Sequence, residues 1–356
     1  MSAPWQTLNR RLSDLGFYQA YRTFGDGNMR VWDWDYTAGL LTAEAERVWR
    51  FFLCREKLSR TEVTKILGAA VLATLLTSGL CHETKAGVSM GKSALISYQG
   101  HPFFVEISPE PRSMLTEDSK AVISAIPRPD FQRCLSLYSG GGVECLGLNH
   151  HPDREVTFIQ PEADPRFLKA NWELNSCTSN FSVSKSWKLP KASTFDLVLA
   201  RIPSWALPAK YSPEMFCSGG ADGLKELNRC FKFVAPRLAD GGVFSFSCLL
   251  YGEEKVATAW PRLQGIAEAV GLNLTAVCSS RQSLEPGIPL FGHLLGFLQY
   301  RTKASTRELL ETLLNHFGEH RMSHVHFLRA TAKMSSGSPR HSLLDLSDRY
   351  YGNWSI

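Results

Sequence analysis

The chain has 356 residues, of which 44% are hydrophobic and 21% are charged, and its formal net charge is +5 at pH 7. This composition predicts a well-packed soluble globule of two domains, or of one large domain with additions. So small a charge excess gives no reason to expect a nucleic-acid partner.

Secretion, membrane insertion and metal binding are not expected. The N-terminal residues lack the apolar core of a secretion signal, and the longest apolar stretch, residues 66–80, is too short and too polar to span a bilayer. Nine cysteines lie scattered from Cys54 to Cys278 without a C-x-x-C pair, which favours reduced thiols and a cytoplasmic location. No metal-ligand spacing appears, so we expect no metal.

The first hundred residues are predicted to be mainly helical. Apolar residues at helical spacing predict helices over 5–16 and 42–56. A capping-box pattern at residues 59–62 starts a third helix, and Gly68 separates it from a fourth. Residues 87–108 then alternate as a β-hairpin does.

Helix, turn, helix and hairpin is the order of a winged helix. The second helix of this pair has almost no Lys or Arg, so it is poorly suited to grip DNA phosphates. We therefore predict that residues 1–110 form a structural or lid domain. Modules of this kind also mediate dimerisation, which makes a homodimer a further expectation.

Residues 111–335 are predicted to be an α/β domain. A proline-punctuated linker with a helix starting near Glu117 leads to alternating strands and helices. Strands are predicted over 134–138, 156–162, 181–187, 195–203, 243–251, 273–280 and 323–333, and helices over 163–177, 223–242, 254–271 (kinked at Pro261) and 305–318. This alternation predicts a doubly wound, Rossmann-like sheet with ligands at the carboxyl ends of its strands. The tail, residues 336–356, is predicted to be partly ordered.

A glycine loop follows the first strand of this domain, in the stretch "CLSLYSGGGVECLGL". Glycines at 140–142 let the backbone approach a ligand closely. The missing Lys-Ser/Thr excludes a Walker A loop, and Cys145 stands where a dinucleotide fold has its third glycine. Glu162, about twenty residues further on, is placed to accept hydrogen bonds from ribose hydroxyls.

Four stretches in order resemble a known family: "YSGGGVECLGL", "PEADPRFLKANWELN", "FDLVLARIPSWALP" and "GGADGLKELNRCFKFVAPRLADGGVF". They look like class I S-adenosylmethionine-dependent methyltransferases, and among these like the glutamine N5-methyltransferases of release factors. The resemblance covers about residues 115 to 333 and implies a class I methyltransferase sheet with S-adenosylmethionine as cofactor.

The resemblance also implies which residues hold the cofactor. Gly140 and Gly142, with Ser139 between strand and glycines, would flank its methionine and ribose. Glu162 would hold the ribose diol, and Trp187, beside Ser186, would lie near the adenine. A tight turn for the glycines and a solvated surface acid for Glu162 remain the alternatives.

Three positions depart from the family pattern. Ser136 and Ser186 stand where the family has acids, and Arg201 stands where its N-P-P-Y motif has asparagine, so that the motif reads "RIPS". Arginine has no acceptor for an amide N–H, which argues against glutamine methylation. Its guanidinium instead suits a carboxylate, although Arg201 pointing to solvent or pairing with a neighbouring acid is equally open.

Displacement at a sulfonium needs an in-line approach, desolvation and a neutral nucleophile. Aromatic rings stabilise the sulfonium cation, and the candidates are Tyr138, Trp172, Trp187 and Trp205, with Tyr138 and Trp205 placed best. Ser204 is either a weak hydrogen-bond partner near the reacting centre or a strand-end cap. Each aromatic residue is also compatible with ordinary core packing.

Three functions fit these observations. The first is methyl transfer to a small, carboxylate-bearing substrate of specialised metabolism. The second is cyclisation of S-adenosylmethionine to azetidine-2-carboxylate with release of methylthioadenosine, as in methyltransferase-like azetidine-2-carboxylate synthases. The third is a decayed, non-catalytic regulator, which does not explain why Gly140 and Gly142 are present.

Overall fold

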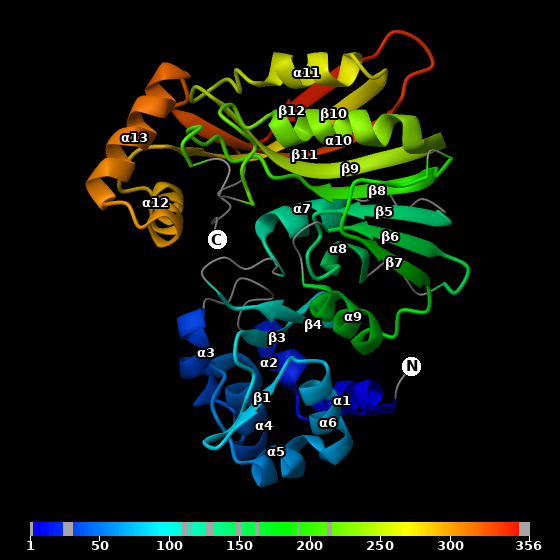
Figure 1. Cartoon of the computed structure of the whole chain (residues 1–356), viewed down its shortest axis with the longest axis vertical. Coiled ribbons are helices and arrows are strands. Elements are labelled where there is room, and N and C mark those ends of the chain that lie inside the picture. The colour runs from blue at the N-terminus through cyan, green and yellow to red at the C-terminus, as the bar shows by residue number, and fades with distance from the viewer. Residues whose placement is uncertain are drawn as a thin grey trace.

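The structure is a computed structural model and describes residues 3–23, 31–108, 113, 115–125, 131–146, 148, 151–160, 164–190, 192–211 and 216–348. A large twisted sheet with helices on both faces occupies one half of the molecule. Helices and hairpins of the N-terminal region occupy the other half, and α9 lies between the two (Figure 1).

Short helices and two hairpins build the N-terminal region. They are α1 (Ala3–Asp14), α2 (Phe17–Thr23), α3 (Val31–Ala38), α4 (Ala43–Trp49) with a π-helical turn (Arg50–Cys54), α5 (Arg60–Leu67), α6 (Ala69–Thr77), β1 (His82–Thr84), β2 (Gly87–Ser89), β3 (Ser93–Tyr98) and β4 (His101–Glu106). The predicted capping box is confirmed, because the Ser59 side chain accepts from the Glu62 N–H while the Glu62 carboxylate accepts from the Ser59 N–H. Gly68 separates α5 from α6 at a φ of 88°.

The predicted hairpin over 87–108 is only partly right. β3 and β4 pair through a turn at Gln99 and Gly100, both with positive φ. Residues 87–89 instead form β2, which pairs with β1 in a separate two-stranded sheet. The alternation of polar and apolar residues therefore identified strands but not their partners.

The N-terminal region shares its hydrophobic core with part of the α/β domain. Its buried side chains form one cluster with Val143 and Leu146 of α8 (Val143–Leu146) and with Phe167, Ala170 and Leu174 of α9 (Pro165–Leu174). Because α8 follows the glycine loop directly, this core extends to within one residue of that loop.

The α/β domain contains eight strands and the helices that connect them. They are α7 (Glu117–Ala125), β5 (Arg133–Leu137), α8, β6 (Glu155–Ile159), α9, β7 (Asn180–Ser184), β8 (Phe195–Arg201), α10 (Lys225–Val234), β9 (Leu238–Gly252), α11 (Trp260–Glu268), β10 (Leu272–Ser283), α12 (Pro289–Thr302), α13 (Thr306–Glu319), β11 (His324–Met334) and β12 (His341–Asp345).

The strand order is β12-β10-β11-β9-β8-β5-β6-β7, and β11 alone of these runs antiparallel to its neighbours. From β5 the chain moves outward to β6 and β7 and then returns to β8 on the other side. The order therefore reverses between β5 and β8, which is where an open α/β sheet has its ligand crevice. The predicted Rossmann-like methyltransferase sheet is confirmed.

Helices cover both faces of the sheet. On one face, Leu227 and Phe231 of α10 and Leu263 of α11 pack into a cluster with the strands. On the other face, Val122 of α7 and Leu168 of α9 pack into a second cluster. Two-sided burial explains why the central strands have such continuous apolar runs.

Two local expectations need correction, and two elements were not predicted. The helix predicted over 223–242 ends at Val234, because Pro236 has no N–H and the chain enters β9 at Leu238. Pro261 lies in the first turn of α11 and kinks nothing. The sequence analysis missed α12, whose apolar residues lie on more than one side. The tail supplies β12, parallel to β10.

Within the described part of the chain, no helix is long and apolar enough to cross a bilayer. All nine cysteines lie in that part and all are free thiols.

Candidate functional site

The glycine loop connects the carboxyl end of β5 to α8. Gly140 and Gly142 have φ of 57° and 76°, and the Gly142 N–H donates to the Ser139 carbonyl at 3.2 Å. A Cβ on Gly142 would lie 2.4 Å from Leu168 of α9. Gly142 is therefore required both by its backbone conformation and by the close approach of α9.

Tyr138, the last residue before this loop, has the same left-handed backbone conformation, with a φ of 60°. Such a conformation is unfavourable for a bulky residue, and it costs about 1–3 kcal/mol. A strained backbone conformation persists only where contacts of the surrounding structure fix it, and such conformations are common at functional sites. The sequence gives no sign of it, since glycine is the usual residue for this conformation.

The Tyr138 side chain joins an aromatic cluster. Its ring lies 5.5 Å from that of Trp187, which in turn meets Phe233 edge-on at 4.9 Å and has the Arg229 guanidinium 4.4 Å above it. The Tyr138 hydroxyl donates to the Glu226 carboxylate at 2.6 Å. Burial, more than this contact, raises the pKa of Tyr138, so the phenol keeps its proton near neutral pH.

Gln160 follows β6 and lies beside the glycine loop. It is only 2% exposed, and its Nε2 donates to the Ser139 hydroxyl at 3.0 Å. Its Oε1 is buried, with no hydrogen-bond partner in the part of the chain that the structure describes. Glu162, predicted to bind the ribose, lies outside the described residues. Gln160 is thus the polar side chain seen at this strand end, and the sequence analysis passed over it because it sought an acid.

Ser186 lies in a turn after β7 and is exposed. Its carbonyl accepts from the Ser184 hydroxyl at 2.8 Å, and its own hydroxyl accepts from the Lys188 N–H at 3.4 Å. These local bonds orient the turn that presents Trp187. The indole Nε1 of Trp187 is buried and finds no partner among the described side chains and backbone.

Arg201 ends β8 and reaches across the switch point. Its guanidinium donates to the hydroxyls of Thr116 and Ser119 at 3.2 and 3.4 Å, and to the carbonyl of Tyr138 at 3.4 Å. These contacts are long, and all are to neutral oxygens. The sequence left open that Arg201 faces solvent or forms an ion pair with a neighbouring acid. Its guanidinium bonds to neutral oxygens instead, and it forms no ion pair with a described acidic side chain.

A row of serines lies beside Arg201 on the sheet face under α7. Strand register aligns Ser136 with Leu199 and Leu199 with Ser245, and it aligns Arg201 with Ser247 one pleat nearer the carboxyl ends. The three serines are 0–1% exposed, and their hydroxyls have no partner among the described residues. A buried hydroxyl left unpaired costs about 1–3 kcal/mol, so their presence needs a reason.

The remaining predicted site residues lie apart from this cluster. The Ser204 hydroxyl accepts from the Leu249 N–H at 2.8 Å, which is the strand-end role left open above. Trp205 packs into the cluster formed by α12 and α13, and Trp172 is core, its Nε1 donating to a backbone carbonyl at 3.1 Å. Of the four aromatic candidates, only Tyr138 and Trp187 come together.

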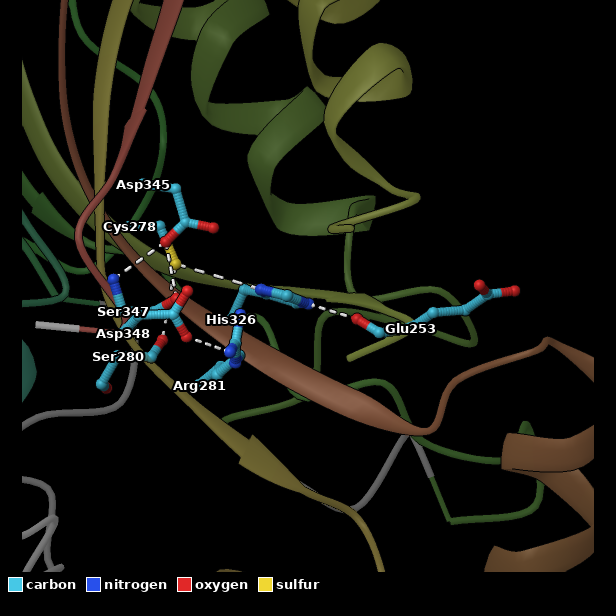
Figure 2. A network of polar contacts seen from close by, with 8 residues as sticks. All are labelled: Glu253, Cys278, Ser280, Arg281, His326, Asp345, Ser347 and Asp348. Carbon is cyan, nitrogen blue, oxygen red and sulfur yellow. Dashed lines mark hydrogen bonds and ion pairs between the residues drawn. The ribbon is translucent and has the colours of Figure 1, made fainter. Parts of the chain in front are cut away.

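A second polar cluster lies at the edge of the sheet formed by β12, β10 and β11 (Figure 2). It joins residues of β10, β11, β12 and the segment after β12: Cys278, Ser280, Arg281, His326, Asp345, Ser347 and Asp348. The Cys278 Sγ lies 4.0 Å from the His326 Nδ1, and His326 Nε2 lies 2.9 Å from the Glu253 carbonyl oxygen. Burial raises the pKa of Cys278 to about 12, so this thiol is not an activated nucleophile.

No protein-family model matches the sequence, and it has no significant match among curated proteins. Solved structures with a distant likeness include the cyclase SpnF, at 14% identity and a TM-score of 0.38 over 62% of this chain and 80% of that one. A putative transferase from Pyrococcus horikoshii has 12% identity and a TM-score of 0.39 over 85% and 98% of the two chains.

A third, phosphoethanolamine N-methyltransferase 2 of Haemonchus contortus in complex with S-adenosylmethionine, has 13% identity and a TM-score of 0.33 over 61% of this chain and 52% of that one. Likeness at this level says nothing about substrate. The strand order of the sheet carries the fold assignment.

Proposed function

We propose that the chain is an S-adenosylmethionine-using enzyme that transfers a methyl group to a small, carboxylate-bearing metabolite. One observation carries this proposal. Among the described residues, five of the buried polar atoms without a partner belong to β5, β9 and the segments after β6 and β7: Gln160 Oε1, Trp187 Nε1 and the hydroxyls of Ser136, Ser245 and Ser247. Native proteins rarely leave such groups unpaired, so a polar ligand in this crevice accounts for them together.

The residues on the β6 and β7 side fit an adenosine. Gln160 Oε1 can accept a hydrogen bond from a ribose hydroxyl, and the N–H of Trp187 can donate to an acceptor on the ligand. The glycine loop would lie against the methionine. Once bound, S-adenosylmethionine supplies a sulfonium whose attached carbons are open to a nucleophile.

The residues on the β8 side fit an anionic acceptor. Arg201 makes three long bonds to neutral oxygens, which a carboxylate can replace by shorter, charge-assisted ones. The Ser247 hydroxyl, on the neighbouring strand in register with Arg201, is free to add a further bond. Together they would hold and orient the acceptor.

The same geometry favours an acceptor that the protein need not deprotonate. Tyr138 keeps its proton because burial raises its pKa, and the groups bonded to Arg201 are hydroxyls and a carbonyl. None of these is a base near pH 7. A carboxylate oxygen or an amine that is already neutral meets this requirement.

The test is to measure S-adenosylmethionine binding by calorimetry and then to incubate the protein with the cofactor and a series of small carboxylates. The proposal expects S-adenosylhomocysteine and a methylated product by mass spectrometry, only when an acceptor is present. Arg201→Gln should lower turnover with that acceptor, while Arg307→Gln, a matched change at a side chain that is 88% exposed on α13, should not.

Two outcomes contradict the proposal in different ways. Methylthioadenosine and a new cyclic amino acid from the cofactor alone would replace methyl transfer by cyclisation. No binding of S-adenosylmethionine at micromolar to millimolar concentrations would leave a non-catalytic role.

A further inference from the structure

Helix α9 connects the N-terminal region to the glycine loop. One face of α9 bonds to the N-terminal region along its whole length: Arg166 Nη1 donates to the Gly79 carbonyl at 2.9 Å, Asn175 Nδ2 to the Pro102 carbonyl at 2.5 Å, and Trp5 Nε1 to the Glu173 carboxylate at 2.5 Å. The opposite face packs under β6 through Leu168 and Trp172. A displacement of the N-terminal region must therefore act on α9.

Asn171 lies at the centre of α9 and is fully buried. Its Oδ1 accepts from the Phe104 N–H at 2.5 Å, and its Nδ2 donates both to the Phe104 carbonyl at 3.1 Å and to the Gly141 carbonyl at 3.0 Å. The side-chain amide thus takes the place of a strand partner for β4 and at the same time holds the glycine loop. Both of its N–H donors are used.

Asn171 bonds to the backbone of Phe104 and to that of Gly141, and both residues are tightly packed against their neighbours. The Phe104 ring packs against Trp5 and Phe52, with centroid distances of 5.8 and 6.5 Å, deep in the N-terminal core. At the other end, a Cβ on Gly141 would lie 3.0 Å from Asn171 Nδ2 and 2.4 Å from the Ser113 hydroxyl. Gly141 is glycine because the loop backbone lies directly on this amide.

We propose that Asn171 is a positioning residue that couples the N-terminal region to the glycine loop. The β3–β4 hairpin sets the position of Asn171, and Asn171 sets the position of the Gly141 carbonyl and the loop around it. The expected effect on S-adenosylmethionine affinity rests on the function proposed above. The structural coupling between the N-terminal region and the glycine loop does not depend on that function.

Asn175 provides a matched control. It is the C-cap residue of α9, one turn beyond Asn171, is 6% exposed and bonds to the same hairpin at Pro102, but among the described residues it makes no hydrogen bond to the glycine loop. Asn171→Ala and Asn175→Ala therefore each remove one buried amide from the same interface. Only the first removes a bond to the loop.

The experiment measures amide hydrogen exchange of the peptide that spans the loop, the dissociation constant for S-adenosylmethionine, and the melting temperature of each variant. With comparable losses in melting temperature, Asn171→Ala should raise loop exchange and the dissociation constant at least tenfold. Asn175→Ala should change either quantity less than threefold. Asn171→Asp, which keeps volume and the acceptor for Phe104 but loses both donors, should behave like Asn171→Ala and serves if the alanine variant does not fold.

Equal effects of the two alanine variants on the loop, or wild-type exchange in Asn171→Ala, would overturn the proposal. If the wild-type protein does not bind S-adenosylmethionine, the proposed function fails, and the exchange comparison still decides whether Asn171 couples the two parts.

Discussion

The molecule has two polar clusters on one sheet, and they differ in how completely they are satisfied. Around Cys278, His326 and Asp345 (Figure 2), side chains bond to one another, to backbone groups or across an ion pair. On β5, after β6 and on β9, Gln160 and three serines have buried polar atoms with no partner among the described residues. The side chains of the first cluster bond to groups within the described residues, whereas polar atoms of the second have no partner there.

This difference is more informative than the residue types. A Cys, His and Asp in proximity suggest catalysis, yet burial leaves the thiol protonated at neutral pH. Serines and a glutamine suggest nothing by themselves, yet polar atoms that lack a partner among the described residues, near a topological switch point, are what the proposed ligand site rests on.

The largest effect should come from the loop itself. Gly142→Ala places a Cβ 2.4 Å from Leu168 at a φ of 76°, so strain and overpacking should lower the free energy of unfolding by about 3 kcal/mol. Cofactor binding should be lost as well. Denaturant unfolding and calorimetry measure both, and Gly265→Ala on α11, with no atom within 4 Å of the new Cβ, is the control.

Arg201→Gln comes next. Loss of charge-assisted bonds to the acceptor should lower kcat/KM about 100-fold, which corresponds to about 2.7 kcal/mol. The dissociation constant for the cofactor should stay within about threefold, because the expected cofactor contacts lie on the β6 and β7 side. A steady-state assay that finds kcat/KM unaltered would remove Arg201 from the acceptor site.

A smaller effect is expected at Gln160. Gln160→Ala removes one acceptor for the ribose and one donor to Ser139, and it should weaken S-adenosylmethionine binding about tenfold. Gln160→Glu keeps an acceptor and should recover most of this loss. If both variants bind as tightly as wild type in calorimetry, the unpaired Oε1 does not face the ligand.

The cluster around Cys278, His326 and Asp345 should influence the stability of the fold but not cofactor binding. Burial lowers the pKa of His326, helped by His324 and Arg281 and opposed by Asp345 and the Glu253 carbonyl. In the unfolded chain, His326 has its ordinary pKa of about 6.5 and binds a proton more readily than in the folded protein. The contribution of His326 to the free energy of unfolding is therefore fully present above about pH 6.5 and is lost as the pH falls.

Removing the imidazole of His326 should make the free energy of unfolding depend less on pH. Between pH 6.5 and 5.5, His326→Gln should lose less stability than wild type. Comparing denaturant unfolding curves of the two proteins isolates His326, because His316, whose pKa burial also lowers, is present in both. A change in cofactor affinity would contradict the structural role of this cluster.

Much of the fold could be predicted because periodicity and turn chemistry are local. The capping box at Ser59, the glycine at 68 and the strand at Cys134 each depend on a few neighbouring residues. The helix start at Pro261 and the end of α10 were misjudged for a related reason. A proline has one meaning in the first turn of a helix and another inside it, and apolar spacing alone does not locate the turn.

The candidate site could be predicted only in outline. The glycine loop and Arg201 were recognisable from their positions after strands. Gln160, Glu226 and Asn171 were not, because each acquires its role from a partner between 21 and 88 residues away. Trp205 was placed next to the chemistry by its neighbour in the sequence, but it packs instead against α12 and α13.

By itself, the sequence determined most of the strands and helices and where the backbone turns through glycine, since these follow from side-chain periodicity and local sterics. Only the tertiary structure decided which polar atoms find partners. Hydrogen bonding inside a protein depends on groups brought together from distant segments, and burial sets the cost of each one that is missed.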